Sequence, residues 1–222
     1  MKRTLLAIPL LLCATAHAQG AVVLLDPARG GAETGGRIAD RVLEKQVTLD
    51  LAGRLGSMLR ARGFTVAMTR EADTDTTNDA RAALANTTHP IACILLHATA
   101  TGVGLHLYTT SLPQSTADAS SPQLWDQAQA AYANQSALLA KELQTAFARS
   151  RIPVSMGKTW MRPLDNMQCA AVAVEVSPQK DGTGANDNAY QARIADVIAG
   201  AMIFWRGNQP APAVTAPAGA QP

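Results

Sequence analysis

Short apolar segments alternate with helical patterns along most of this 222-residue chain. Residues 21–26 (AVVLLD) form an apolar run, and a proline and two glycines follow within five residues. Apolar residues then recur every four positions from Leu43 to Leu59, which predicts a long helix beginning near Asp40. An alternation of this kind favours a mostly parallel β-sheet with helices on both faces, which is an α/β fold.

The same alternation continues to the end of the folded region. A helix through Arg81 is expected between the second and third strands, an alanine-rich helix up to about Arg149 follows a polar loop, and a final helix ends near Trp205. The further expected strands are FTVAMT (64–69), IACILL (91–96), VGLHLYT (103–109) and CAAVAVEV (169–176).

The first 18 residues have a separate pattern. Lys2 and Arg3 precede an apolar run from Leu5 to Leu12, and small residues end at Ala18, which predicts a secretory signal peptide. The run is shorter than the roughly 20 residues that a membrane-spanning helix needs. We therefore expect a secreted or periplasmic protein without a transmembrane anchor.

The remaining residues predict one folded domain. With 47% hydrophobic and 16% charged residues, the chain has enough apolar side chains for a core. We assign the domain to residues 19–206 and expect it to be a monomer. The Pro/Ala-rich remainder, residues 207–222, lacks a core-forming pattern and is expected to be disordered.

Removal of the predicted signal peptide leaves a chain that is formally neutral. The full sequence has 19 Lys and Arg against 17 Asp and Glu, and residues 1–18 hold two of those cations and no acid. A nucleic-acid-binding protein usually has a basic excess that neutralises phosphates. The charge balance therefore argues against nucleic acid as a partner.

Two cysteines, Cys93 and Cys169, remain after residue 18. A disulfide can persist in a secreted protein. Both cysteines lie in apolar runs, however, where a reduced thiol packs as a small hydrophobic group. We favour two buried thiols and keep a disulfide as the alternative.

Polar residues stand where the carboxyl ends of the strands are expected. The turn DPARGG follows the first strand, His97 ends IACILLH, and Glu175 ends CAAVAVE. Glu44 lies in the first turn of the first long helix, which opens at the same edge. Ligands bind beyond the carboxyl ends of strands in such folds, and catalytic zinc takes nitrogen and oxygen ligands.

Each of these residues also has a structural explanation when it is taken singly. Glu44 can complement a helix dipole, His97 can be a hydrogen-bonded core histidine, and Glu175 can form a salt bridge at the sheet rim. Their order along the chain is more specific than any one of them.

Six segments of the chain follow one another in a specific order: DPARGG, LEKQVTLDLAGRLGSMLRARGFTVAMTR, Asp73, NDARAALAN, LLHATA and VEV. In this order they resemble the zinc-dependent N-acetylmuramoyl-L-alanine amidases that cleave peptidoglycan. The resemblance extends over nearly all of residues 21–206. It implies a six-stranded mixed sheet, a Zn²⁺ ion held by two histidines and a glutamate, and a second glutamate for catalysis. Glu44 matches the ligand glutamate, His97 the second ligand histidine, and Glu175 the catalytic glutamate.

The first ligand histidine of the family is absent. Ala28 and Arg29 stand where the family has glycine and histidine, and an arginine stays protonated and offers no lone pair to zinc. Glu33, in the same glycine-rich turn, is the nearby carboxylate that offers a substitute for the missing ligand. Thr99 replaces an asparagine of the family. Val176, Ser177 and Pro178 follow Glu175, where the family has glycine and phenylalanine.

Three functions remain open on this basis. The first is a zinc amidase that hydrolyses the bond between N-acetylmuramic acid and L-alanine. The second is a protein with the same fold that binds peptidoglycan or regulates its turnover without hydrolysis, with Arg29 at the metal position. The third, a secreted structural protein without a cell-wall ligand, follows from the fact that a fold does not fix a function.

Overall fold

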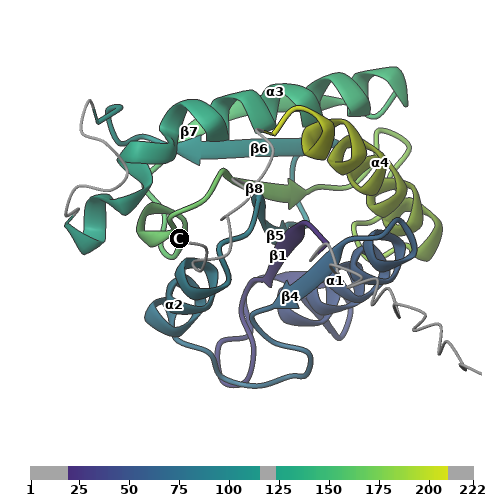
Figure 1. Ribbon diagram of the computed structural model, residues 1–222. Coiled ribbons are helices and arrows are strands. Elements are labelled where there is room, and N and C mark those ends of the chain that lie inside the picture. The colour runs from purple at the N-terminus through teal and green to yellow at the C-terminus, as the bar shows by residue number, and fades with distance from the viewer. Residues whose placement is uncertain (1–19, 116–123, 210–222) are drawn as a thin grey trace, which may run out of the picture.

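The computed structural model describes residues 20–115 and 124–209 as one α/β domain (Figure 1). The predicted signal peptide and most of the predicted tail lie outside these residues. Six strands form one sheet in the order β4-β1-β5-β8-β6-β7. They are β1 (Val22–Pro27), β4 (Thr65–Met68), β5 (Ala92–Ala98), β6 (Leu105–Thr110), β7 (Val154–Thr159) and β8 (Ala171–Val176).

The sheet is mixed, as expected. β4, β1, β5 and β8 pair in parallel, whereas β6 pairs antiparallel with β8 and parallel with β7. The carboxyl ends of β1, β5 and β8 therefore share one edge with the beginning of β6. Strand β7 is an edge strand with mostly exposed or half-buried side chains. Its sequence has no buried apolar run, and the sequence analysis did not identify it.

Helices cover both faces of the sheet (Figure 1). The larger core lies between one face and the helices α1 (Glu44–Ala61), α3 (Ala133–Arg149) and α4 (Asn188–Gly207). The smaller core lies under α2 (Asn78–Thr88) and the 3₁₀ helix η2 (Leu164–Asn166). Within the described ranges, no helix is long and apolar enough to cross a membrane.

Two segments differ from the sequence-based expectation. Helix α1 begins at Glu44 rather than near Asp40, because residues 37–43 form a small hairpin of β2 (Arg37–Ala39) and β3 (Val42–Leu43). The alanine-rich segment begins with a 3₁₀ helix, η1 (Trp125–Tyr132), before α3.

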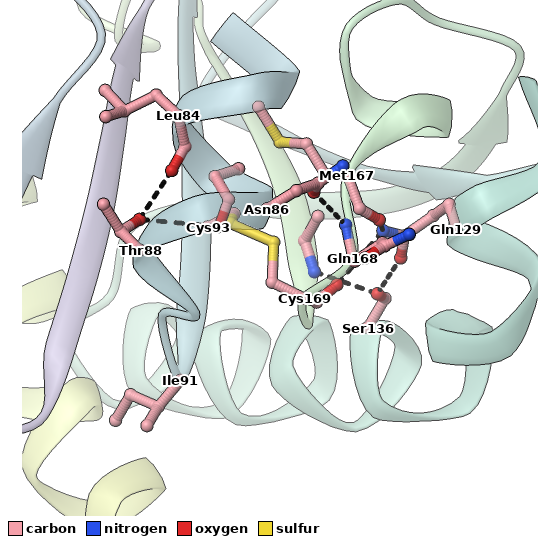
Figure 2. The surroundings of a disulfide bond; sticks show 12 residues. Leu84, Asn86, Thr88, Ile91, Cys93, Gln129, Ser136, Met167, Gln168 and Cys169 are labelled. Carbon is pink, nitrogen blue, oxygen red and sulfur yellow. Dashed lines mark hydrogen bonds between the residues drawn. A yellow bond between two sulfur atoms is a disulfide. The ribbon is translucent and has the colours of Figure 1, made fainter. Parts of the chain in front are cut away.

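Cys93 and Cys169 form a disulfide, so the interpretation as two buried thiols is wrong (Figure 2). Cys93 lies in β5, and Cys169 precedes β8, its parallel neighbour in the sheet. Their Cα atoms are 6.3 Å apart, although 76 positions separate them in the sequence. The bond lies in the smaller core, near the end of the sheet opposite the polar residues discussed below.

Candidate functional site

The turn after β1 brings Arg29 to the carboxyl edge of the sheet. Arg29 has a φ of 69°, and Gly30 and Gly31 also have positive φ. This left-handed backbone turns the chain sharply away from the strand. The Ala28 amide donates to the carbonyl of Leu96 in β5, which fixes the start of the turn against the neighbouring strand.

Two buried arginines hold the carbonyl groups of this turn. Arg70 donates to the carbonyls of Pro27 and Ala28, each at 2.9 Å. Arg81, in α2, donates to the carbonyls of Pro27 and Arg29 and forms a buried ion pair of 2.6 Å with Asp26. The turn is thus fixed by charge-assisted hydrogen bonds from two other parts of the chain. The sequence analysis placed Arg81 in a helix but found no function for either arginine.

Arg29 is paired with two carboxylates. Its Nε lies 3.1 Å from Glu44 Oε2, and its Nη1 lies 2.5 Å from Glu33 Oε1. Burial favours the neutral guanidine, but the hydrogen bond to Glu33 and the charge of Glu44 outweigh it, so the pKa of Arg29 is raised. Glu33, which the sequence offered as a substitute ligand, therefore forms an ion pair with Arg29.

Glu44 stands at the first position of α1 and is buried, with 6% of its side chain exposed. Its second oxygen, Oε1, lies 3.1 Å from Nδ1 of His97, and the Gly36 amide donates to Oε2. A side chain at Gly35, where φ is 68°, would collide with this carboxylate. Burial alone would raise the pKa of Glu44, but His97, Arg29 and the Gly36 amide outweigh it and lower the pKa to about 2.

Glu175 lies next to His97 in the sheet. The two residues face each other across β5 and β8, and His106 of β6 faces Glu175 from the other side. Paired positions of neighbouring strands project to the same face. Burial and the charge of Glu175 raise the pKa of Tyr108, which lies two residues further along β6. His106 Nδ1 lies 2.7 Å from Ser155 Oγ.

A pocket of about 550 Å³ joins these residues. Arg29, Glu44, His97 and Glu175 all line it, so the structure brings together the four residues that the sequence analysis placed at this edge. Three arginines line it against two glutamates. Two of them, Arg37 and Arg162, have no ion-pair partner within residues 20–115 and 124–209. Sequence reasoning missed both, because neither belongs to a recognisable motif.

The residues present do not fit a catalytic zinc ion. Such a site generally offers three protein ligands and one open position. Here the Arg29 guanidinium donates a hydrogen bond to Glu44, and a cation at the position of the missing ligand repels a divalent ion. Among the residues that the structure describes, no group of three His, Cys, Asp or Glu side chains is arranged to hold a metal.

The chain matches the sequence family described as N-acetylmuramoyl-L-alanine amidase over residues 23–203. It is similar to the germination-specific N-acetylmuramoyl-L-alanine amidase of Bacillus subtilis (strain 168), with 46% identity over 56 residues. That alignment covers 25% of this chain and 23% of the relative. The chain therefore matches less than a quarter of the length of this curated relative.

Solved structures show the same fold. The amidase Ami1 from Mycobacterium smegmatis has a TM-score of 0.69 and 23% identity, covering 86% of this chain and 98% of its own. The amidase AmiC2 of Nostoc punctiforme has a TM-score of 0.66 and 19% identity, covering 84% of this chain and 97% of its own.

Proposed function

The chain belongs to the N-acetylmuramoyl-L-alanine amidase family, and we propose that it binds peptidoglycan stem peptides in the pocket without zinc-dependent hydrolysis. The observation that carries this proposal is the ion pair between Arg29 and Glu44, which stands where the family has a metal ligand. The fold of the family is kept, whereas the donor set suited to zinc is not.

Two exposed arginines supply the binding chemistry. Arg37 and Arg162 line the pocket, and neither has an acidic partner in the described part of the chain. Stem peptides carry free carboxylates, and arginine binds carboxylates through parallel hydrogen bonds. Arg29 is already paired with Glu33 and Glu44, so its main contribution is to hold the carboxylate of Glu44 in place.

Glu175 and His97 remain at the pocket wall and give it polar groups for the peptide backbone. We assign them to substrate binding in this chain. The family role of Glu175 in catalysis and those of Glu44 and His97 as zinc ligands are expected to return only when a third ligand is supplied.

We also propose that the protein acts in the cell envelope. The pattern of residues 1–18 predicts export, and the Cys93–Cys169 disulfide supports an oxidising compartment. On this proposal the exported protein is a monomer with one domain, residues 19–206.

Calorimetric titration with a free stem peptide tests the binding site. We expect the Arg37→Gln, Arg162→Gln double variant to bind at least about tenfold more weakly, because it loses charge-assisted hydrogen bonds. Arg60→Gln is the matched control, since Arg60 is an exposed arginine in the last turn of α1, at the other end of that helix from the pocket. Equal affinity of the double variant and the wild type would contradict the proposed site.

A further inference from the structure

A row of three polar side chains crosses the strands β8, β6 and β7, which are neighbours in the sheet (Figure 1). Glu175, His106 and Ser155 occupy directly paired positions on these strands, so they project to the same face. The row begins at Glu175 in the pocket wall and ends at Ser155, which is exposed. It therefore places a carboxylate, an imidazole and a hydroxyl in the order that nucleophilic catalysis uses.

The half-buried imidazole of His106 is in contact with the hydroxyl of Ser155. Its Nδ1 lies 2.7 Å from Ser155 Oγ, within the range of a hydrogen bond. In the tautomer that carries its proton on Nε2, Nδ1 accepts from the Ser155 hydroxyl. His106 is then placed to take that proton when Ser155 attacks an electrophile.

The other side of the imidazole favours this tautomer. Gly102 has a φ of 82°, and a side-chain carbon there would lie 3.2 Å from Nε2 of His106 and 3.1 Å from Oγ of Ser177. Ser177 is fully buried, and its hydroxyl has no hydrogen-bond partner in the described part of the chain. The absent side chain at Gly102 thus lets Nε2 and an unpaired hydroxyl face the same space. A proton on Nε2 suits this hydroxyl, which leaves Nδ1 as the acceptor.

Strand β7 also offers a backbone donor next to Ser155. The Leu105 amide donates to the Pro153 carbonyl at 2.8 Å, so the odd-numbered residues of β7 direct their backbone groups towards β6. The even-numbered residues direct theirs to the open edge of the sheet. Met156 follows Ser155, and its amide therefore points to this edge. An amide directly after a nucleophilic serine is a common donor to a developing oxyanion.

We propose that Ser155 is a nucleophile that takes the acyl group of small carboxylic esters, with His106 as its base. The Ser155 oxygen forms a bond to the ester carbonyl carbon, and its proton passes to Nδ1 of His106. The bond from this carbon to the alcohol oxygen then breaks, and the alcohol leaves with the proton from Nδ1. The negative charge of Glu175 stabilises the imidazolium between these two transfers.

Water completes the cycle by the same route. It attacks the acyl carbon and gives a proton to Nδ1, and this proton passes to Ser155 Oγ as the acid leaves. The activity goes beyond the binding of stem peptides and does not depend on it, because Ser155 and His106 do not line the pocket.

Incubation with p-nitrophenyl acetate tests the nucleophile. Mass spectrometry of proteolytic peptides locates the acetyl group, and absorbance follows the release of nitrophenolate. We expect the wild type to be acetylated at Ser155. His106→Asn is expected to slow this acetylation at least about a hundredfold, because the base is lost. Ser155→Ala should release nitrophenolate at least about a hundredfold more slowly.

Two matched variants control for the loss of a serine and of a histidine elsewhere. Ser57→Ala removes an exposed hydroxyl that donates to the Gly53 carbonyl in α1, and His89→Asn replaces an exposed histidine after α2. Both are expected to react as the wild type does. Acetylation that misses Ser155 in the wild type overturns the proposal whether or not the variants fold, as does equal acetylation of Ser155 in a folded His106→Asn variant.

Glu175 acts through His106 and is a positioning residue in this reaction. Glu175→Gln is expected to slow the acetylation of Ser155 about tenfold, because the imidazolium loses a neighbouring negative charge. Glu175→Asp keeps the charge and should restore most of the rate. Equal rates in Glu175→Gln and Glu175→Asp would contradict the role of the charge.

Discussion

The left-handed backbone at Arg29 is one that histidine adopts more readily than most side chains do. Ala28 is not among the described residues with positive φ, so alanine in place of the family's glycine does not require a left-handed backbone there. A histidine at position 29 is therefore expected to fit, next to Glu44 and His97.

We expect Arg29→His to bind Zn²⁺ at least about a hundredfold more tightly than the wild type, because it replaces a cation with a third ligand. Arg29→Asn is the control, since asparagine also tolerates the left-handed region but is a poor zinc ligand. Competition with a chromophoric chelator measures the affinity. Any gain of amide hydrolysis in Arg29→His should vanish when Glu175→Ala is added. Equal zinc affinity of the wild type, Arg29→His and Arg29→Asn would show that a histidine at position 29 lies too far from Glu44 and His97 to share a zinc ion with them.

Tyr190 is buried in α4, and its hydroxyl has no hydrogen-bond partner within the described ranges. Burial raises the pKa of Tyr190 to about 12, against a small opposing effect of Arg193. Between the ordinary pKa near 10 and this value, the unfolded state releases a proton that the folded state keeps. The free energy of unfolding therefore falls as the pH rises through this window.

We expect Tyr190→Phe to raise the free energy of unfolding by about 1 kcal/mol at pH 7, because it removes a buried unpaired group. The advantage should grow by about 2 kcal/mol towards pH 12. Urea unfolding at pH 7, 10 and 11.5 measures both effects. Parallel pH curves for the two proteins would contradict the assigned environment of Tyr190.

Helix α2 is joined to β1 by the ion pair between Arg81 and Asp26, whose side chains are 3% and 1% exposed. Removing one member of a buried pair leaves the other charge without compensation. We expect Arg81→Met to lower the free energy of unfolding by about 3 kcal/mol and to speed amide exchange in the turn at 28–31. The control is Arg62→Met, because Asp196 of the Arg62–Asp196 pair is 63% exposed and the pair should contribute less than about 1 kcal/mol. Equal losses in both variants would contradict the role of Arg81.

The disulfide joins Cys93 in strand β5 to Cys169, which directly precedes the neighbouring strand β8 (Figure 2). We expect Cys93→Ala with Cys169→Ala to lower the free energy of unfolding by about 2–5 kcal/mol, because a long loop is no longer closed in the unfolded chain. A reductant should destabilise the wild type to a similar degree and leave the double variant unchanged. Stability that is insensitive to reductant in both proteins would show that the bond is absent in solution.

The elements that the sequence predicted are those with strong local signals. The apolar run of β5 and the period-four pattern of α1 identified a central strand and a covering helix. Strand β7 has no such signal, because an edge strand keeps few side chains in the core. The disulfide was misjudged because the proximity of Cys93 to Cys169 depends on the strand order, which local patterns do not contain.

The strand order also explains which site residues were predictable. Parallel strands end at one edge, so a motif at the end of each strand could be placed there from the sequence. Arg70 and Arg162 stand outside those motifs, and their roles depend on how distant segments pack around the edge. The sequence therefore predicted the family and the four residues that meet at this edge, and the structure was needed to find the surrounding cations.

The proposed binding without hydrolysis concerns the whole molecule and is tested on the peptidoglycan polymer. Purified peptidoglycan sacculi incubated with the wild-type protein and added Zn²⁺ provide the test, with Arg29→His alongside. Sedimentation measures binding, and mass spectrometry of the supernatant measures released stem peptides. We expect the wild type to sediment with the sacculi and to release no stem peptide above the level of a protein-free control. Zinc-dependent release of stem peptides that begin with L-alanine by the wild type would contradict this account.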